Sequence, residues 1–292
     1  MADFSVLSYC DGDVSLPSRP SNSHKGTFGR VLCVCGSTGM CGAAYFAAKA
    51  AYRAGAGLVR ILTTEENRSI LQALIPEATL SVYDGHHPEP NVIDEAVAWA
   101  DVLVVGCGLG TSLASKALVS HILRFAEKPL ILDADALNLL AIHPALMTHA
   151  RGAILTPHLG EMARLLGKSV AEIASDPPSV AYEFAKKTGT VCALKSHRTV
   201  ISDGSPRLFV NASGNSGMAT GGSGDVLAGL LGGLLAQEQN RHLPPLDLTA
   251  LGVYLHGKCG ELASERLTEF SVMASDLLDA IPSVLKQYPT KP

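Results

Sequence analysis

Residues 211–230 read NASGNSGMATGGSGDVLAGL, and this stretch is the most informative in the chain. Its six glycines and its single carboxylate, that of Asp225, lead directly into an apolar run with helical spacing. The first backbone N–H groups of such a helix have no intrahelical partner, and the helix dipole adds partial positive charge there. The stretch therefore predicts a binding site for an anion, such as a phosphate group, at the start of this helix.

Asp225 admits two interpretations. A carboxylate at an anion site would repel a phosphate, so its presence is explained if it acts as a general base beside a transferring phosphoryl group. It is equally well explained if it stabilises the N-terminus of its own helix. A plain helix cap does not require Gly221, Gly222 and Gly224 together, so we favour the general base.

Short β-rich runs alternate with helical runs from residue 30 onward. Strands are expected at residues 31–35, 58–62, 102–105, 130–132, 153–155, 191–194, 199–201 and 208–210. Helices are expected at residues 43–54, 70–74, 93–99, 115–125, 136–140, 160–166, 179–188, 225–237, 248–267 and 274–288. Continuous apolar strands that alternate with helices predict an α/β fold with a mainly parallel sheet covered on both faces. The Asp203-Gly204 turn signal adds an antiparallel hairpin at one edge, over residues 191–210.

Length and composition predict one domain over residues 1–292. We found no internal repeat and no linker, and 47% hydrophobic residues suffice for one large core. Residues 1–29, rich in serine and proline, are expected to form a partly ordered lead-in.

The net charge of −4 and the absence of a Lys/Arg cluster argue against a nucleic-acid partner. The longest candidate apolar run, residues 226–236, is too short to span a bilayer, and the N-terminus lacks an apolar signal core. We therefore expect no membrane association and a cytoplasmic location. The seven cysteines are expected to be reduced.

Further candidate ligand segments follow the predicted strands, where open α/β sheets bind ligands. Residues 36–42, GSTGMCG, do not match the dinucleotide spacing G-x-G-x-x-G and are equally explained by a tight turn. Residues 106–110, GCGLG, would let a ligand or another backbone approach closely. Asp133 and Asp135 could serve a Mg²⁺–phosphate site or cap the next helix, and for Asp135 we favour the cap.

His158 and Glu161 lie three residues apart at a strand-to-helix junction, so one helical turn could present both to the same cleft. No third ligand has a fitting spacing, which argues against zinc, and a structural role for His158 stays open. Lys195 ends a predicted strand and is followed by Ser196-His197-Arg198-Thr199. These residues could hold a nucleotide phosphate or ribose, or could form a solvated turn.

Taken in order, these motifs resemble the ADP/ATP-dependent NAD(P)H-hydrate dehydratases, which have a ribokinase-like fold. The resemblance extends from His24 to Leu277, and its most specific part is residues 214–229, GNSGMATGGSGDVLAG. It implies repair of the S-form of hydrated NADH and NADPH: a nucleotide phosphorylates the ring hydroxyl, and phosphate then leaves to restore the double bond. ADP is implied in preference to ATP, with release of AMP and phosphate, and Mg²⁺ assists.

The resemblance also implies roles for individual residues. Asp225 would deprotonate the substrate hydroxyl. The anion hole would consist of the N–H groups of Gly222, Ser223 and Gly224. The hydrate would contact Ala43, Gly110, His158 and Asp225. The adenine nucleotide would contact Lys195, Ser196, His197, Arg198, Thr199 and Gly224. Glu161 would lie near Mg²⁺, through water.

Three positions depart from the family pattern, in which glycine is expected at Ser196, proline at Cys107 and threonine at Ser223. Relatives often carry a fused epimerase domain, for which this chain has no room, so a separate NAD(P)H-hydrate epimerase is the expected functional partner. A homo-oligomer, by resemblance a tetramer, is expected as well.

Two other functions remain open on the sequence. A small-molecule kinase of the same fold, acting on a vitamin precursor of the hydroxyethylthiazole type, would share the anion hole and Asp225. A nucleotide-binding regulatory protein without turnover would not need Asp225, so the presence of this carboxylate argues against it.

Overall fold

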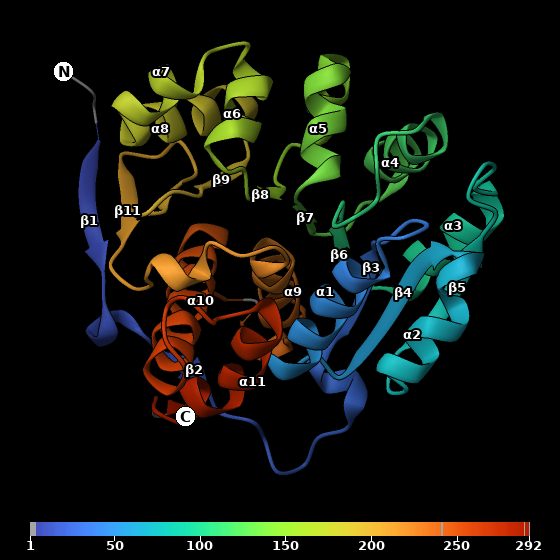
Figure 1. The fold of residues 1–292 in the computed structure, drawn as a ribbon, viewed down its shortest axis with the longest axis horizontal. Helices are drawn as coiled ribbons and strands as arrows, with labels where there is room; N and C mark the ends of the chain where they lie inside the picture. The colour runs from blue at the N-terminus through green and yellow to red at the C-terminus, as the bar shows by residue number, and fades with distance from the viewer. Residues whose placement is uncertain (1–3, 241, 289, 292) are drawn as a thin grey trace.

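A ten-stranded sheet forms the centre of the computed structural model, which describes residues 4–240, 242–288 and 290–291 (Figure 1). The strand order is β1-β11-β10-β9-β8-β7-β6-β3-β4-β5. These strands are β1 (Ser5–Tyr9), β3 (Arg30–Val34), β4 (Leu58–Thr64), β5 (Thr79–Tyr83), β6 (Val102–Val105), β7 (Leu130–Leu132), β8 (Ile154–Leu155), β9 (Val191–Leu194), β10 (Val200–Ser202) and β11 (Arg207–Asn211). A separate parallel pair joins β2 (Leu16–Pro17) to β12 (Thr290–Lys291).

Helices cover both faces of the sheet. They are α1 (Cys41–Arg53), α2 (Arg68–Leu74), α3 (Pro90–Trp99), α4 (Leu113–Phe125), α5 (Asp135–Ile142), α6 (Leu159–Leu166), α7 (Val170–Ser175), α8 (Pro177–Thr188), α9 (Ser223–Ala236), α10 (Pro245–Arg266) and α11 (Ala274–Leu285). Successive residues of a strand point to opposite faces, so Val31 and Cys33 of β3 join the core under α1, α9, α10 and α11. Leu32 and Val34 join the opposite core, under α3, α4, α5, α6 and α8.

The sheet is parallel except at β10. This strand pairs antiparallel with both β9 and β11, and Gly204, with a φ of 80°, lies in the turn that leads from β10 to β11. The predicted mainly parallel sheet and its antiparallel hairpin are therefore confirmed. Strand β1 adds a further parallel strand outside β11, with Ser5 opposite Arg207.

Close packing between α1 and α9 places the start of α9 at the carboxyl edge of the sheet. A Cβ atom on Gly229 would lie 2.0 Å from the carbonyl oxygen of Ala47, and one on Gly233 would lie 2.3 Å from that of Ala51. Only glycine allows this approach, so the glycines of α9 fix where Asp225 lies.

All the predicted strands are present within two residues of their expected bounds, and all the predicted helices within three. Strands β1, β2, β5 and β12 and helix α7 are not among the predicted elements. Strands β2 and β12 are only two residues long. Strands β1 and β5 lie at the edges of the large sheet, and four of the five residues of β1 are exposed, so neither has the continuous apolar run of an inner strand. Among the described residues, none of the helices combines the length and apolar character that crossing a bilayer demands.

Candidate active site

A cleft of about 950 Å³ opens at the carboxyl edge of the sheet, between the segments that follow β7, β8, β9 and β11 and the start of α9. Most of the residues singled out in the sequence line it: His158, Glu161, Lys195, Ser196, His197, Thr199, Gly222, Ser223, Gly224 and Asp225. The described residues that line it do not include Ala43, Gly110 or Arg198. The side chain of Arg198 is directed instead to the carbonyl oxygen of Ala212, at 3.2 Å.

The first turn of α9 faces this cleft with little side-chain cover. Gly222 is the N-cap and has a φ of 90°, a left-handed conformation that favours glycine. A Cβ atom there would lie 2.8 Å from Phe46 and 2.9 Å from Ala274. A Cβ atom on Gly224 would lie 3.2 Å from Lys195 Nζ. The glycines thus keep the orphan N–H groups of the first turn accessible beside a cation.

Asp133, which follows β7, is the centre of a buried polar network. It is 1% exposed, and its Oδ1 atom accepts from Lys195 Nζ at 2.8 Å and from Thr156 Oγ1 at 2.7 Å. Burial alone would lower the pKa of Lys195, but Asp133 and Glu161 outweigh burial and raise it. Lys195 is therefore a fixed positive charge at the start of α9.

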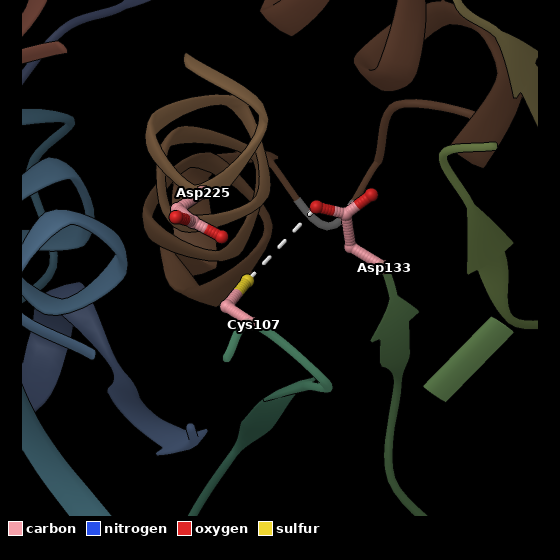
Figure 2. A group of neighbouring side chains, drawn as sticks. All are labelled: Cys107, Asp133 and Asp225. Carbon is pink, nitrogen blue, oxygen red and sulfur yellow. Dashed lines mark hydrogen bonds between the residues drawn. The ribbon is translucent and has the colours of Figure 1, made fainter. Parts of the chain in front are cut away.

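Asp225 lies across the cleft floor from Asp133, in the first turn of α9, and Figure 2 shows both carboxylates close to Cys107. Burial is the main cause that raises the pKa of Asp225 to about 6, and the negative charge of Asp133 adds to it. A carboxylate with this pKa is ionised at neutral pH yet readily takes up a proton, which suits a general base.

His158 and Glu161 form the N-terminal cap of α6. Nδ1 of His158 accepts from the N–H groups of Gly160 at 3.0 Å and Glu161 at 3.3 Å, so this ring nitrogen carries no proton. Oε2 of Glu161 accepts from the backbone N–H of His158 at 2.8 Å. Burial raises the pKa of Glu161 to about 7, although Lys195 acts to lower it. The structural role considered for His158 is therefore present, and the ring also lines the cleft.

Ala43 and Gly110 belong to two segments that pack on each other outside the cleft lining. The loop after β6 packs on the loop before α1, because a Cβ atom on Gly108 would lie 2.7 Å from Ala43 Cβ and Ser37 Oγ donates to the Gly108 carbonyl oxygen at 2.9 Å. Asp135, which we had expected to cap its helix, accepts instead from the Gly110 N–H at 2.7 Å.

Sequence reasoning did not single out His256 or Ala134, both of which line this cleft. His256 of α10 is 8% exposed and lines the cleft, with its Nε2 atom 3.4 Å from Ser223 Oγ; burial lowers its pKa to about 4, so the ring is neutral. No local pattern distinguishes this histidine inside a long buried helix. Ala134 has a φ of 48°, a strained conformation for alanine that costs about 1–3 kcal/mol and often marks functional sites.

Comparison with known proteins identifies the family. The family model described as NAD(P)H-hydrate dehydratase matches residues 31–283. The chain belongs to the NAD(P)H-hydrate dehydratase family. Two relatives of this dehydratase family illustrate the similarity. The chain is 41% identical over 280 residues to the bifunctional NAD(P)H-hydrate repair enzyme of Moorella thermoacetica, covering 93% of this chain and 52% of that one. It is 39% identical over 253 residues to the ADP-dependent (S)-NAD(P)H-hydrate dehydratase of Neisseria meningitidis, covering 85% of this chain and 81% of that one.

The chain spans about half the length of the bifunctional repair enzymes it matches. Solved structures of similar proteins confirm the ribokinase-like fold. The ADP/ATP-dependent NAD(P)H-hydrate dehydratase of Bacillus subtilis, co-crystallised with ATP and Mg²⁺, matches with a TM-score of 0.79 and 32% identity, covering 94% of this chain and 95% of that one. A ribokinase-like protein of Enterococcus faecalis matches with a TM-score of 0.84 and 31% identity, covering 100% and 98%.

Proposed function

We propose that this chain removes water from the S-form of hydrated NADH and NADPH, driven by hydrolysis of a nucleotide, with ADP favoured over ATP. The observation that carries the proposal is Asp225, whose pKa is about 6, in the glycine-rich first turn of α9 beside Lys195. Family membership and the name of the Neisseria meningitidis relative support the choice of substrate and nucleotide.

In this proposal Asp225 takes the proton of the ring hydroxyl as that oxygen attacks the terminal phosphorus of the nucleotide. The bond from this phosphorus to the leaving nucleotide oxygen breaks, which gives AMP when ADP is used. The phosphate ester then loses phosphate, a proton leaves the neighbouring ring carbon, and the double bond of NADH or NADPH is restored. Phosphoryl transfer of this kind depends mainly on positioning and on stabilisation of charge.

The N–H groups of Gly222, Ser223 and Gly224 would stabilise charge on the transferring phosphoryl group, and Lys195 would add a positive charge that Asp133 holds in place. His256 would steady the Ser223 hydroxyl. We assign Ser196, His197, Arg198 and Thr199 to the nucleotide, with Arg198 acting through its backbone because its guanidinium is directed to Ala212. Ala43, Gly110 and His158 are assigned to the hydrate.

Mg²⁺ prefers oxygen ligands and retains several waters, so a carboxylate near the phosphates suits it better than the Cys107 sulfur. Glu161 is a carboxylate of this kind, because it is buried at the cleft wall. Its Oε2 atom already accepts from the His158 N–H, so we assign it to the ion through water and not by direct contact. When bound with the nucleotide, the ion would supply positive charge to the phosphates.

The pairing with a separate epimerase, the homotetramer and the cytoplasmic location inferred from the sequence stay predictions.

The test is the near-ultraviolet absorbance of reduced nicotinamide, followed while the purified protein is incubated with NADH hydrate, Mg²⁺ and either ADP or ATP. A nucleotide-dependent rise, with release of inorganic phosphate, is expected, and the faster nucleotide identifies the phosphoryl donor. A flat trace with both nucleotides from folded protein would contradict the proposal. A stable phosphorylated product would favour the small-molecule kinase instead.

A further inference from the structure

Cys107 lies directly beneath the proposed base, in the loop that follows β6. Its side chain is fully buried, it is a free thiol, and Figure 2 shows its sulfur close to the carboxylates of both Asp133 and Asp225. The Sγ atom lies 4.0 Å from Asp133 Oδ2. One ligand atom from each of the three residues lies within 4.8 Å of the other two.

The two oxygens of Asp133 are used differently. Oδ1 accepts two strong hydrogen bonds, from Lys195 and Thr156, whereas the partner of Oδ2 is the thiol at 4.0 Å, a weak donor. A carboxylate oxygen in a residue that is 1% exposed is thus left without a strong partner and faces the centre of the group. Lys195 already pairs the charge of this carboxylate through Oδ1, so Oδ2 is the oxygen that is left for a further donor or a cation.

We propose that Cys107, Asp133 and Asp225 bind a thiophilic divalent cation of the Zn²⁺ type. One sulfur and two carboxylate oxygens form a donor set that zinc accepts, and three protein ligands leave the fourth position open to the cleft that Asp225 lines. Mg²⁺ and Ca²⁺ take oxygen ligands, so the sulfur disfavours both ions at this position.

Size and charge both permit the ion. The ligand atoms of a tetrahedral zinc ion lie about 3.5 Å apart. The sulfur and the two carboxylate oxygens lie within 4.8 Å of one another here, so they need to move by about 1 Å. On binding, the thiol proton leaves to solvent. The charges of the thiolate and the two carboxylates are then balanced by the ion together with Lys195.

A cation bound here would occupy the carboxylate that the proposed reaction needs as its base, so it would inhibit the enzyme reversibly. This consequence rests on the proposed function, whereas the metal site itself does not. The two are therefore tested separately.

The binding test uses the metal alone, without nucleotide or substrate. Co²⁺ is added to the wild-type chain, to Cys107→Ala and to Cys10→Ala, which removes an exposed thiol. A thiolate-to-cobalt charge-transfer band that Zn²⁺ abolishes is expected in the wild type and in Cys10→Ala, and its loss in Cys107→Ala. Calorimetry with Zn²⁺ should show at least a 10-fold weaker affinity for Cys107→Ala, and a 100-fold excess of Mg²⁺ should not displace the zinc; a 10-fold change corresponds to about 1.4 kcal/mol.

The proposal is overturned if the wild type shows no such band, or if Cys107→Ala binds Zn²⁺ as tightly as the wild type does. Thermal melting checks that the variant is folded; if it is not, Cys107→Ser keeps the size of the side chain, provides no thiolate and should lose the band equally. Should the chain catalyse the dehydration, Zn²⁺ should inhibit the wild type and Cys10→Ala at a concentration that leaves the rate of Cys107→Ala, relative to its own zinc-free rate, unchanged.

Discussion

Lys195 Nζ lies 2.8 Å from Asp133 Oδ1, and the same ammonium would lie only 3.2 Å from a Cβ atom on Gly224. The buried ion pair therefore lies next to the first turn of α9 at Gly224, which has no side chain. This contact connects the carboxyl ends of β7 and β9 to the helix that carries Asp225. It explains why a glycine, a lysine and an aspartate so far apart in the sequence belong to one site.

Replacing Asp225 with Asn should remove the base and leave the site otherwise intact. Loss of a general base typically lowers kcat by about 10²–10⁴-fold. Asn has nearly the same size and relieves the burial of a charge, so the affinity for ADP should survive. Steady-state kinetics on NADH hydrate together with calorimetry of ADP binding check this, and an unchanged kcat in the folded variant would show that another group takes the proton.

Gly224→Ala tests the space beneath Lys195. The added methyl group would lie only 3.2 Å from Lys195 Nζ and in van der Waals contact with Asp133 Oδ2 at 3.4 Å, and it would crowd the proposed phosphoryl position. We expect kcat/KM to fall at least 10-fold, about 1.4 kcal/mol in the transition state, with little change in melting temperature because a helix tolerates alanine.

The matched control is Gly221→Ala, because a Cβ atom at Gly221 would have nothing within 4 Å. Its kcat/KM should stay within a few fold of the wild type. Equal losses in both variants would mean that the glycine content of the loop matters, rather than the space beside Lys195.

The dependence of kcat/KM on pH should report Asp225. Its pKa is raised to about 6, first by burial and then by Asp133, and the base works only when ionised, so kcat/KM should fall as the pH drops through about 6. Asp133→Asn removes a like charge and frees Lys195, which acts to lower the pKa of Asp225. The midpoint of the acidic limb should therefore move to lower pH in this variant.

Glu161→Gln serves as the control for this limb, because Glu161 also has a raised pKa, about 7. Asp133 raises the pKa of Glu161 as well, so the shift in Asp133→Asn does not by itself distinguish the two carboxylates. If the limb disappears in Glu161→Gln, the titrating group is Glu161, whereas a limb that persists there is assigned to Asp225.

Local patterns in the sequence predicted most of this fold and site, because continuous apolar strands and helix periodicity are local signals. The glycine-rich stretch at the start of α9 is also a local signal, and it predicted the anion site that contains Asp225. The Lys195–Asp133 pair was not predicted, because its members are 62 positions apart and meet only through the strand order of the sheet. His256 was missed because a buried histidine of a long apolar helix has no signature of its own. Asp135 was expected to cap a helix, and only the tertiary structure shows that it holds Gly110 instead.

Glu161 illustrates how such a site lowers stability. In the unfolded chain its pKa has the ordinary value of 4.5, and burial raises it to about 7 in the folded protein. The folded state therefore holds the proton more tightly, and the protein loses stability as the pH rises from about 4.5 to about 7.

Glu161→Gln removes the charge and keeps an oxygen that can accept from the His158 N–H, so it should be more stable than the wild type above pH 7, by on the order of 2 kcal/mol. The gain should nearly vanish at pH 4, where the wild-type carboxyl is protonated in the folded state and mostly protonated in the unfolded state. Chemical denaturation at the two pH values measures this, with the exposed Glu265→Gln as the matched control, which should show no gain at either pH. A gain that persists undiminished at pH 4 would mean that the substitution stabilises by packing and not by removing a buried charge.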